Sequence, residues 1–456
     1  MTQRRVRKHH REAHDVLASG SKRKPSFSAT KRKSVCALYL LIAVAASASV
    51  QTSAREQFQE LRAELRQSHA KNDWRSNLAS AEKLKKFLNE APDSLLEVAR
   101  ASTHVGDLNT AFRMLEQFVD MGQSSELLET LPDFALLRNR REFTNIQDRM
   151  KANQSAISLA STVFSVPDPN LLAEDLDFDP TTRRFFITSV RERKIVSVDA
   201  NGKMTDFAKS PNNWPMLAIK VDSSRGVVWA TEVAMRGFDF APELDWGRSA
   251  LLSYDIKNGT LLGRFEGPRG SALGDMVLML NGSVVVSDGE GGGVYRLLPK
   301  HTELERLDGG DFISPQTPAM HPDGKHIFVP DYLRGIGVLE IDTKQVRWLS
   351  TEGRFALNGI DGLYFDHGLL VAVQNGTSPE RVVAFRMDPR LTRIQSETII
   401  ERSTETLGDP THGVIVGKNF YYIANSGWDV IDEHGNLKAG SRQSAARIMR
   451  ASLQTR

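Results

Sequence analysis

One hydrophobic pattern returns six times between residues 171 and 429 of this 456-residue chain. Each copy has a marked position two residues before a hydrophobic strand. The six marked residues are Glu174, Leu217, Gly274, Gln316, Asp361 and His412. Successive marked positions lie 42 to 57 residues apart. A period in the forties with several short strands per unit is typical of the blades of a β-propeller.

Each copy continues with a second strand rich in β-branched and aromatic residues, such as Val227–Thr231 or Phe420–Ala424, and often with a third, such as Gly337–Asp342. Gly, Asn and Asp bound these runs, as expected for strands joined by hairpins. We therefore predict an all-β, six-bladed propeller over residues 161–456. In a closed ring the same position of every blade faces the central axis, so the six marked side chains are expected to converge.

Residues 1–54 have the pattern of an export signal. Residues 1–33 hold eleven Lys or Arg against two acidic residues, and the next 21 residues carry no charge. The small residues Ala46 and Ala48 stand where a signal peptidase would cut. We therefore predict an exported protein, periplasmic or extracellular. An uncleaved signal anchor is the alternative, since the uncharged run is just long enough to span a membrane; only then is a membrane a partner.

The whole chain carries a net charge of +3, which is smaller than the net positive charge of residues 1–33, so the remainder of the chain is net acidic. A net acidic folded part argues against a nucleic-acid partner. The one cysteine, Cys36, lies inside the leader. The hydrophobic core must therefore hold the exported fold without disulfides.

Residues 55–160 show helical periodicity and predict a small all-α domain before the propeller. Small residues at Val98–Ala101, a Gly106-Asp107 turn and a second helix ending near Gly122 resemble a tetratricopeptide repeat. The resemblance covers about two helix pairs. A cap or spacer on the propeller and a module that binds a protein partner both remain open. The linker 161–170 is expected to be either the domain boundary or a strand, Val163–Val166, that closes the ring.

Three segments of the propeller region resemble the family of gluconolactonases, senescence marker protein (regucalcin) and luciferin-regenerating enzyme. They are Glu174–Asp179, Pro322–Lys325 with Val329–Tyr332, and Asn358–Leu363 with Val373–Gly376. The resemblance implies a propeller that holds a divalent cation, usually Ca²⁺, on its axis and hydrolyses lactones or related esters. It also implies a Glu, an Asn and an Asp from blades one, four and five as ligands, which here are Glu174, Gln316 and Asp361.

These residue types suit the chemistry. Ca²⁺ prefers carboxylate, amide and water oxygens, so Glu174 and Asp361 would balance its charge and Gln316 could offer its amide oxygen. A bound cation polarises a lactone carbonyl, and Asp361 is the expected base. His412 is a second candidate for the catalytic proton acceptor.

Three residues are expected to contact substrate: Asp275, Asn358 and His412. Two marked positions depart from the family pattern, since Gln316 and Gly274 stand where the family usually has Asn. The function therefore stays open between a Ca²⁺-dependent hydrolase of small lactones or esters and a non-enzymatic propeller that binds a ligand or protein, with the helical domain as its interaction module.

Overall fold

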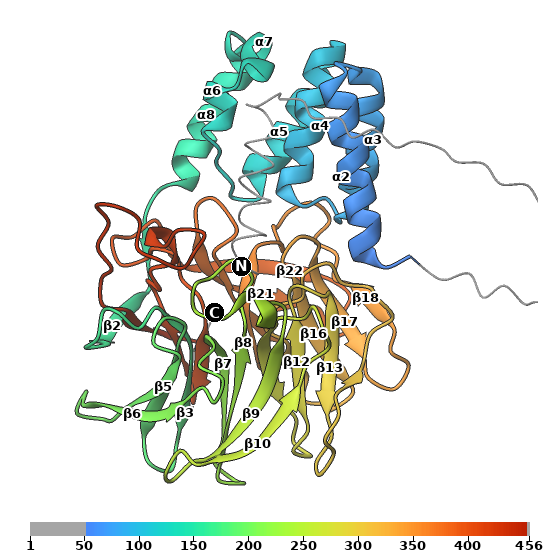
Figure 1. Cartoon of the computed structure of the whole chain (residues 1–456). Coiled ribbons are helices and arrows are strands. Elements are labelled where there is room, and N and C mark those ends of the chain that lie inside the picture. Colours follow the sequence, from blue (N-terminus) through green and yellow to red (C-terminus); the bar gives the residue numbers. More distant parts are fainter. Residues whose placement is uncertain (1–51, 454–456) are drawn as a thin grey trace, which may run out of the picture.

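The computed structural model describes residues 52–453, in which a group of helices stands on one end of a β-propeller (Figure 1). The predicted export signal, residues 1–54, lies almost entirely outside the described residues. None of the helices in residues 52–453 is long and apolar enough to cross a membrane.

The helical part begins at residue 54 and ends at residue 153. Its helices are α2 (Ala54–Ala70), α3 (Trp74–Phe87), α4 (Pro92–Val105), α5 (Leu108–Asp120), α6 (Leu127–Thr130), α7 (Ala135–Arg138) and α8 (Arg141–Asn153), with a 3₁₀ turn at Pro132–Phe134. Successive helices from α2 to α5 pack against one another. Their apolar faces meet in one buried cluster that includes Leu65, Leu95, Leu115 and Phe143. The predicted helical domain is thus observed.

Polar side chains cap the N-termini of α2, α3 and α5. Ser53 and Glu56 form a reciprocal capping box at the start of α2, and Asp73 and Asp107 accept backbone N–H groups at the starts of α3 and α5. Helix α4 ends at Gly106, whose φ of 83° is left-handed. The Gly-Asp turn between α4 and α5 therefore forms as the sequence predicts.

The strands form six sheets of the propeller, which we number as blades 1 to 6 along the chain. Blade 1 contains β3 (Ala173–Asp179), β4 (Arg184–Ser189), β5 (Lys194–Val198) and β6 (Met204–Lys209); blade 2 contains β7 (Met216–Asp222), β8 (Val227–Val233), β9 (Ser249–Asp255) and β10 (Leu261–Glu266); blade 3 contains β11 (Leu273–Leu278), β12 (Val284–Asp288), β13 (Gly293–Leu297) and β14 (Glu305–Arg306). Blade 4 contains β15 (Ala319–Met320), β16 (His326–Asp331), β17 (Gly335–Glu340) and β18 (Val346–Trp348); blade 5 contains β19 (Ile360–Asp366), β20 (Leu369–Gln374), β21 (Arg381–Met387) and β22 (Ile394–Arg402); blade 6 contains β23 (Gly413–Val416), β24 (Asn419–Ile423) and β25 (Arg447–Ser452). The six-bladed propeller predicted from the repeat is confirmed.

A strand from the N-terminal side closes the ring. After α8 the chain adds β1 (Ile157–Ser158) to the outer strand β22 of blade 5, and then adds β2 (Ala160–Ser165) to β25 of blade 6. Blade 6 therefore combines three strands from the end of the propeller region with one from its start. The closing strand that the sequence suggested at residues 163–166 is observed as β2.

The inner strands carry a shared irregularity next to the marked positions. The register shifts between Ala173 and Leu176 in β3, and at the equivalent places in β7, β11 and β19. A β-bulge of this kind bends the strand and re-aims a side chain. In blades 1, 2, 3 and 5 the shift spans the marked residue, and in blades 1 and 5 it helps to direct the side chains of Glu174 and Asp361 toward the axis.

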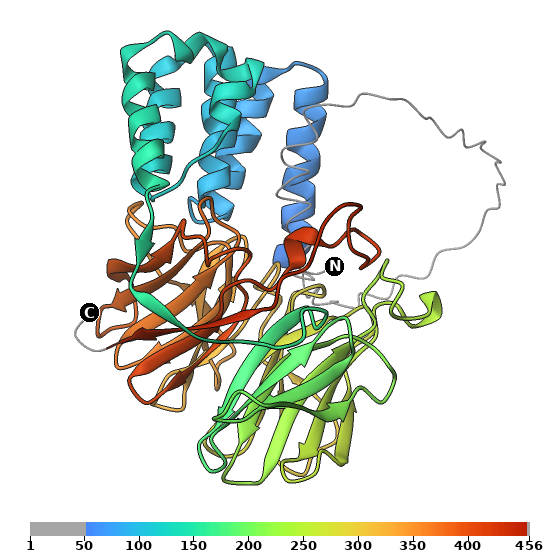
Figure 2. The same cartoon turned by 90° about the vertical axis from the view of Figure 1, so that its left-hand side faces the viewer.

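The helices dock onto the loops of blades 4 and 5 (Figure 2). Arg334, between β16 and β17, lies between the rings of Phe87 and Trp348, at 4.4 and 4.3 Å from their centroids. Its guanidinium also donates to the carbonyls of Phe87 (3.1 Å) and Asp311 (2.8 Å). Ser124 donates its N–H to the carbonyl of Ser378 in blade 5 (2.7 Å).

The propeller has two ends along its axis, and these contacts lie at one of them. The helix-covered end is the one at which β16 finishes at Asp331 and β19 starts at Ile360. The hairpin end is the opposite one, where β15 turns into β16. The marked residues at the starts of the inner strands lie at the helix-covered end.

Candidate metal centre

Three of the marked residues converge on the propeller axis. Glu174, Asp361 and His412 each offer one potential ligand atom, and these atoms all lie within 4.8 Å of one another. They come from blades 1, 5 and 6. All three side chains are buried, with exposed fractions of 3%, 0% and 2%. The two carboxylates that sequence analysis placed together therefore lie close enough to contact one cation.

Backbone geometry in blade 5 directs Asp361 toward the centre. Gly359 has a φ of 64°, and a side chain there would collide with the backbone of Gly376 at 2.5 Å. The turn 358–360 therefore packs directly on the β20–β21 loop. From that loop, Asn375 donates its side-chain N–H to Asp361 Oδ2 at 2.6 Å. Asn375 thus orients one carboxylate of the centre.

The other carboxylate is oriented by a loop of blade 6. Trp428, in a 3₁₀ turn (Trp428–Val430), donates its indole N–H to Glu174 Oε2 at 2.5 Å. The Trp428 ring packs on Phe238 from the long loop of blade 2, with centroids 6.0 Å apart. Two loops that are distant in sequence therefore cover the centre from the side of blades 1 and 2.

Burial gives Glu174 an unusual affinity for a proton or a cation. Removal from water and the negative charges of Asp361 and Asp275 outweigh the opposing effect of His412 and the Trp428 hydrogen bond, and together they raise the pKa of its carboxyl from 4.5 to about 8. An ionised Glu174 therefore requires positive charge beside it. His412 supplies one positive charge, and a divalent cation would balance the remaining negative charge of the carboxylates.

His412 carries a positive charge in this arrangement. Its Nδ1 lies 2.9 Å from the Glu174 carbonyl oxygen and its Nε2 lies 2.6 Å from Asp275 Oδ1. Both of these oxygens accept hydrogen bonds, so both ring nitrogens must carry a proton and donate a hydrogen bond. Burial lowers the pKa of His412, but the charges of Asp361 and Asp275 outweigh it and raise the pKa well above its ordinary value.

The structure places the remaining predicted site residues around this cluster. Asp275 accepts from the Thr317 hydroxyl (2.9 Å) as well as contacting His412. Gln316 is buried, and its amide nitrogen donates to the carbonyl and hydroxyl of Ser314 at 3.2 and 3.1 Å. A cation would use the other end of that amide, Oε1.

Asn358 belongs to a different surface. It lines a pocket of about 280 Å³ between the helices and blades 4 and 5, together with Leu88–Pro92 and Ser350–Gly353. Its backbone carbonyl accepts from the Gln374 side chain at 2.8 Å. Its expected contact with substrate stays a prediction, and the observed geometry connects it with the docking of the helices.

The donor set fits a divalent cation. Glu174 and Asp361 supply two carboxylates, and Asp275 adds a third negative charge nearby, against the single positive charge of His412.

The sequence did not indicate Asn375 or Trp428 as parts of the centre. Asn375 lies in the Val373–Gly376 segment of the family resemblance, and no other feature of the sequence pointed to it. Trp428 is an aromatic residue in a loop, and no pattern in the sequence connected it with the axis.

No protein-family model matches the sequence, and no curated protein matches it. Solved structures of similar fold include a gluconolactonase from Xanthomonas campestris (14% identity, 66% of this chain and 92% of the other, TM-score 0.46). They also include the calcium-binding protein regucalcin from Agrobacterium tumefaciens (15%, 65% and 95%, 0.45) and a putative glucose dehydrogenase from Thermus thermophilus (16%, 65% and 99%, 0.45). The kinds of protein that the sequence resembles are thus among its structural neighbours. At these identities and TM-scores, function has to be argued from the site residues.

Proposed function

We propose that this protein is a divalent-metal-dependent hydrolase of small lactones or related esters, acting at the helix-covered end of the propeller axis. The observation that carries the proposal is the convergence of Glu174 and Asp361, two buried carboxylates from blades 1 and 5, within 4.8 Å of each other. When ionised, these two carboxylates and Asp275 carry three negative charges against the single positive charge of His412, which favours a cation between them. Ca²⁺ is the cation that carboxylate and amide oxygens favour.

Glu174 and Asp361 would hold the cation, with Gln316 Oε1 as a further oxygen. When bound, the cation polarises the carbonyl of the substrate. Asp361 takes the proton of the attacking water, whose oxygen forms the new bond to the carbonyl carbon. The bond between the carbonyl carbon and the ring oxygen then breaks, and the departing alkoxide takes the proton that Asp361 accepted, which gives the hydroxy acid and restores the Asp361 carboxylate. Asn375 keeps Asp361 oriented throughout.

His412 acts differently from the expectation based on its residue type. It donates both ring protons, to the Glu174 carbonyl and to Asp275, so it holds Asp275 in place and reduces the repulsion among the carboxylates. A role as catalytic proton acceptor stays a prediction, and it would require the ring to lose one of these protons first.

The second candidate is a propeller that binds a ligand or protein without turnover. The pocket between the helices and blades 4 and 5 favours it, because that pocket lies outside the axial cluster and is lined by both parts of the chain. For either function we propose the exported location that the leader predicts.

Calcium titration and a substrate panel test the proposal together. A ligand at one hundred times its dissociation constant stabilises the folded state by about 2.7 kcal/mol. We expect Ca²⁺ to raise the unfolding temperature of the full chain, chelation to reverse the rise, and sugar or acyl lactones to be hydrolysed only with the ion present. Absence of both the thermal shift and the hydrolysis would leave the binding propeller.

A further inference from the structure

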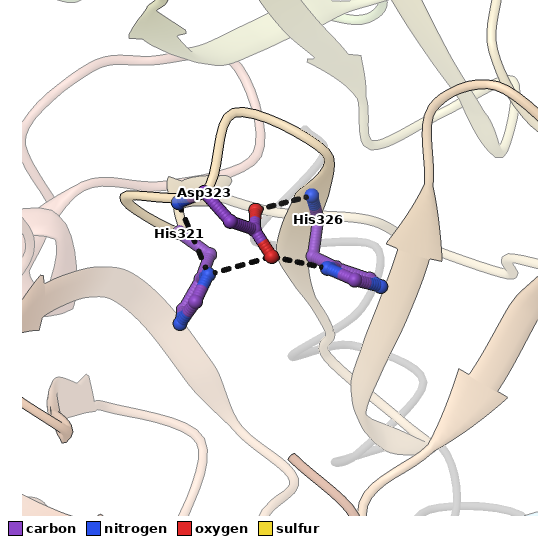
Figure 3. Close-up of side chains that lie close together, drawn as sticks. All are labelled: His321, Asp323 and His326. Carbon is purple, nitrogen blue, oxygen red and sulfur yellow. Dashed lines mark hydrogen bonds and ion pairs between the residues drawn. The ribbon is translucent and has the colours of Figure 1, made fainter. Parts of the chain in front are cut away.

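A second cluster of potential metal ligands lies in one turn at the hairpin end. His321 and Asp323 lie in the turn between β15 and β16, and His326 is the first residue of β16; Figure 3 shows both imidazole rings directed at the Asp323 carboxylate. The ligand atoms that these residues offer all lie within 4.8 Å of one another. The cluster is separated from the axial centre by the length of strand β16, whose far end reaches the helix-covered end.

One carboxylate oxygen serves both rings. Asp323 Oδ2 lies 3.0 Å from His321 Nδ1 and 2.6 Å from His326 Nδ1. The second oxygen, Oδ1, accepts the backbone N–H groups of Lys325 (2.8 Å) and His326 (3.1 Å). The turn therefore fixes the carboxylate and leaves Oδ2 pointing between the two nitrogens.

Nδ1 of His321 faces the same carboxylate oxygen. It lies 3.0 Å from Asp323 Oδ2 and 3.3 Å from the backbone nitrogen of Asp323. At 3.0 Å from a carboxylate oxygen the nitrogen needs a positive charge between the two atoms, which a proton supplies when no metal is bound. A metal ion held by both atoms would take the place of that proton.

Packing holds the His321 ring in this orientation. The ring lies edge-on to Phe365 and Phe328, with centroids 5.2 and 5.9 Å away and interplanar angles of 70° and 78°. The three polar side chains nevertheless remain 23–33% exposed. The cluster is thus preorganised by the blade and still open to an ion from solvent.

We propose that His321, Asp323 and His326 form a second metal site, selective for Zn²⁺ or a similar borderline transition-metal ion. Two imidazole nitrogens and one carboxylate oxygen are common zinc ligands, at about 2.0–2.2 Å from the metal. In a tetrahedral site such ligand atoms are about 3.4 Å apart, so the two contacts of Asp323 would open by less than about 1 Å. Three protein ligands leave the fourth position for water or another ligand. The nitrogen donors distinguish this site from the oxygen-rich axial centre.

Zinc and cobalt binding to the full chain tests the proposal. We expect isothermal titration with Zn²⁺, in excess Ca²⁺ to fill the axial centre, to show one site that His326→Gln weakens by at least about 100-fold, since it loses a direct ligand. Co²⁺ should give the absorption of a tetrahedral nitrogen- and oxygen-ligated ion in the wild type but not in His326→Gln.

Two controls make the result decisive. His367→Gln removes an exposed histidine that contacts Asp366 at 2.6 Å in another hairpin of this end, and it should leave Zn²⁺ affinity unchanged. Asp361→Asn should do the same, because it alters only the axial centre. The proposal is overturned if Zn²⁺ binding survives in His326→Gln, if His367→Gln weakens it equally, or if only Asp361→Asn abolishes it.

Discussion

The two ends of the propeller form their clusters in opposite ways. At the helix-covered end, Glu174, Asp361 and His412 come from three blades and meet only because the ring closes. At the hairpin end, His321, Asp323 and His326 lie within six residues and meet because one turn folds. The first cluster is buried and rich in oxygen donors, whereas the second is partly exposed and contains two nitrogens.

This difference predicts how strongly substitutions at each end should affect activity and stability. A cluster made by ring closure depends on loops, helices and strands far from it, and its charges are costly to leave unpaired. A cluster made by one turn depends mainly on that turn and on the rings of Phe328 and Phe365 that pack against His321. Changes at the helix-covered end should therefore affect both activity and stability, and changes at the hairpin end should affect local ion binding only.

The largest effect is expected from Asp361→Asn, which removes the proposed base and one ligand. Turnover of a lactone should fall by at least about 10²-fold, the usual contribution of general base catalysis, while circular dichroism shows a folded propeller. Asp366→Asn is the matched control, because it lies on the same strand, β19, toward the hairpin end. Equal losses in the two variants would contradict the division between the ends.

Arg334→Ala should loosen the helices from the propeller. It removes two ring contacts and two hydrogen bonds to backbone carbonyls, which together are worth about 2–4 kcal/mol. Limited proteolysis should then cleave the helical part faster than in the wild type. Arg354→Ala removes a half-exposed arginine above Phe355 within the propeller, and it should leave the cleavage rate unchanged. Comparable acceleration by both would show that the docking does not depend on Arg334.

The stabilising effect of calcium should grow with pH. The pKa of Glu174 is raised from 4.5 to about 8 in the folded state. The stability that its protonated form contributes is fully present below pH 4.5 and is lost as pH rises through about 8. Ca²⁺ binds the ionised form, so the calcium-induced rise in unfolding temperature should increase between pH 5 and pH 8.5. A rise that is constant or falls with pH in a thermal scan series would exclude Glu174 as a ligand.

Trp428→Phe should move that pH dependence. Phenylalanine keeps an aromatic ring against Phe238 but loses the N–H donor that lowers the pKa of Glu174. We expect a loss of about 1–2 kcal/mol in unfolding free energy and a shift of the calcium effect to higher pH. Trp246→Phe, which loses only an N–H bond to the Ala241 carbonyl (3.1 Å), should leave the midpoint in place.

The smallest effect is expected from His326→Gln without transition metals. The side chain is partly exposed, so the unfolding free energy should change by less than about 1 kcal/mol, and lactone turnover should remain at the wild-type rate. Urea unfolding and a kinetic assay measure both quantities. A loss of turnover here would show that the two ends are coupled.

The fold was predictable because each blade repeats its local pattern. Alternation of apolar residues gives the strands, Gly and Asn give the turns, and a period in the forties gives the ring. The convergence of Glu174 and Asp361 follows from the ring itself, since equivalent positions face one axis. The strands, the turns and the repeat period can each be recognised from short stretches of the sequence.

The charge state and orientation of the site were not predictable in the same way. The indole N–H that reaches Glu174 comes from Trp428, 254 residues away, and no periodic pattern indicates how the loop 426–446 packs. The two hydrogen bonds of His412 depend on the positions of Asp275 and the Glu174 carbonyl in other blades. The cluster of His321, Asp323 and His326 was not identified from the sequence, because Pro322–Lys325 was considered there only as a segment of the family resemblance.

The arrangement of β2 in blade 6 determines when the axial centre can exist. Strand β2 leaves the ribosome among the first propeller segments, and its partner β25 is made almost 300 residues later. The nascent chain therefore holds an open arc of blades until synthesis of this domain is nearly finished. The metal in the proposed centre would accordingly be acquired after translation, from the compartment in which the arc finally closes.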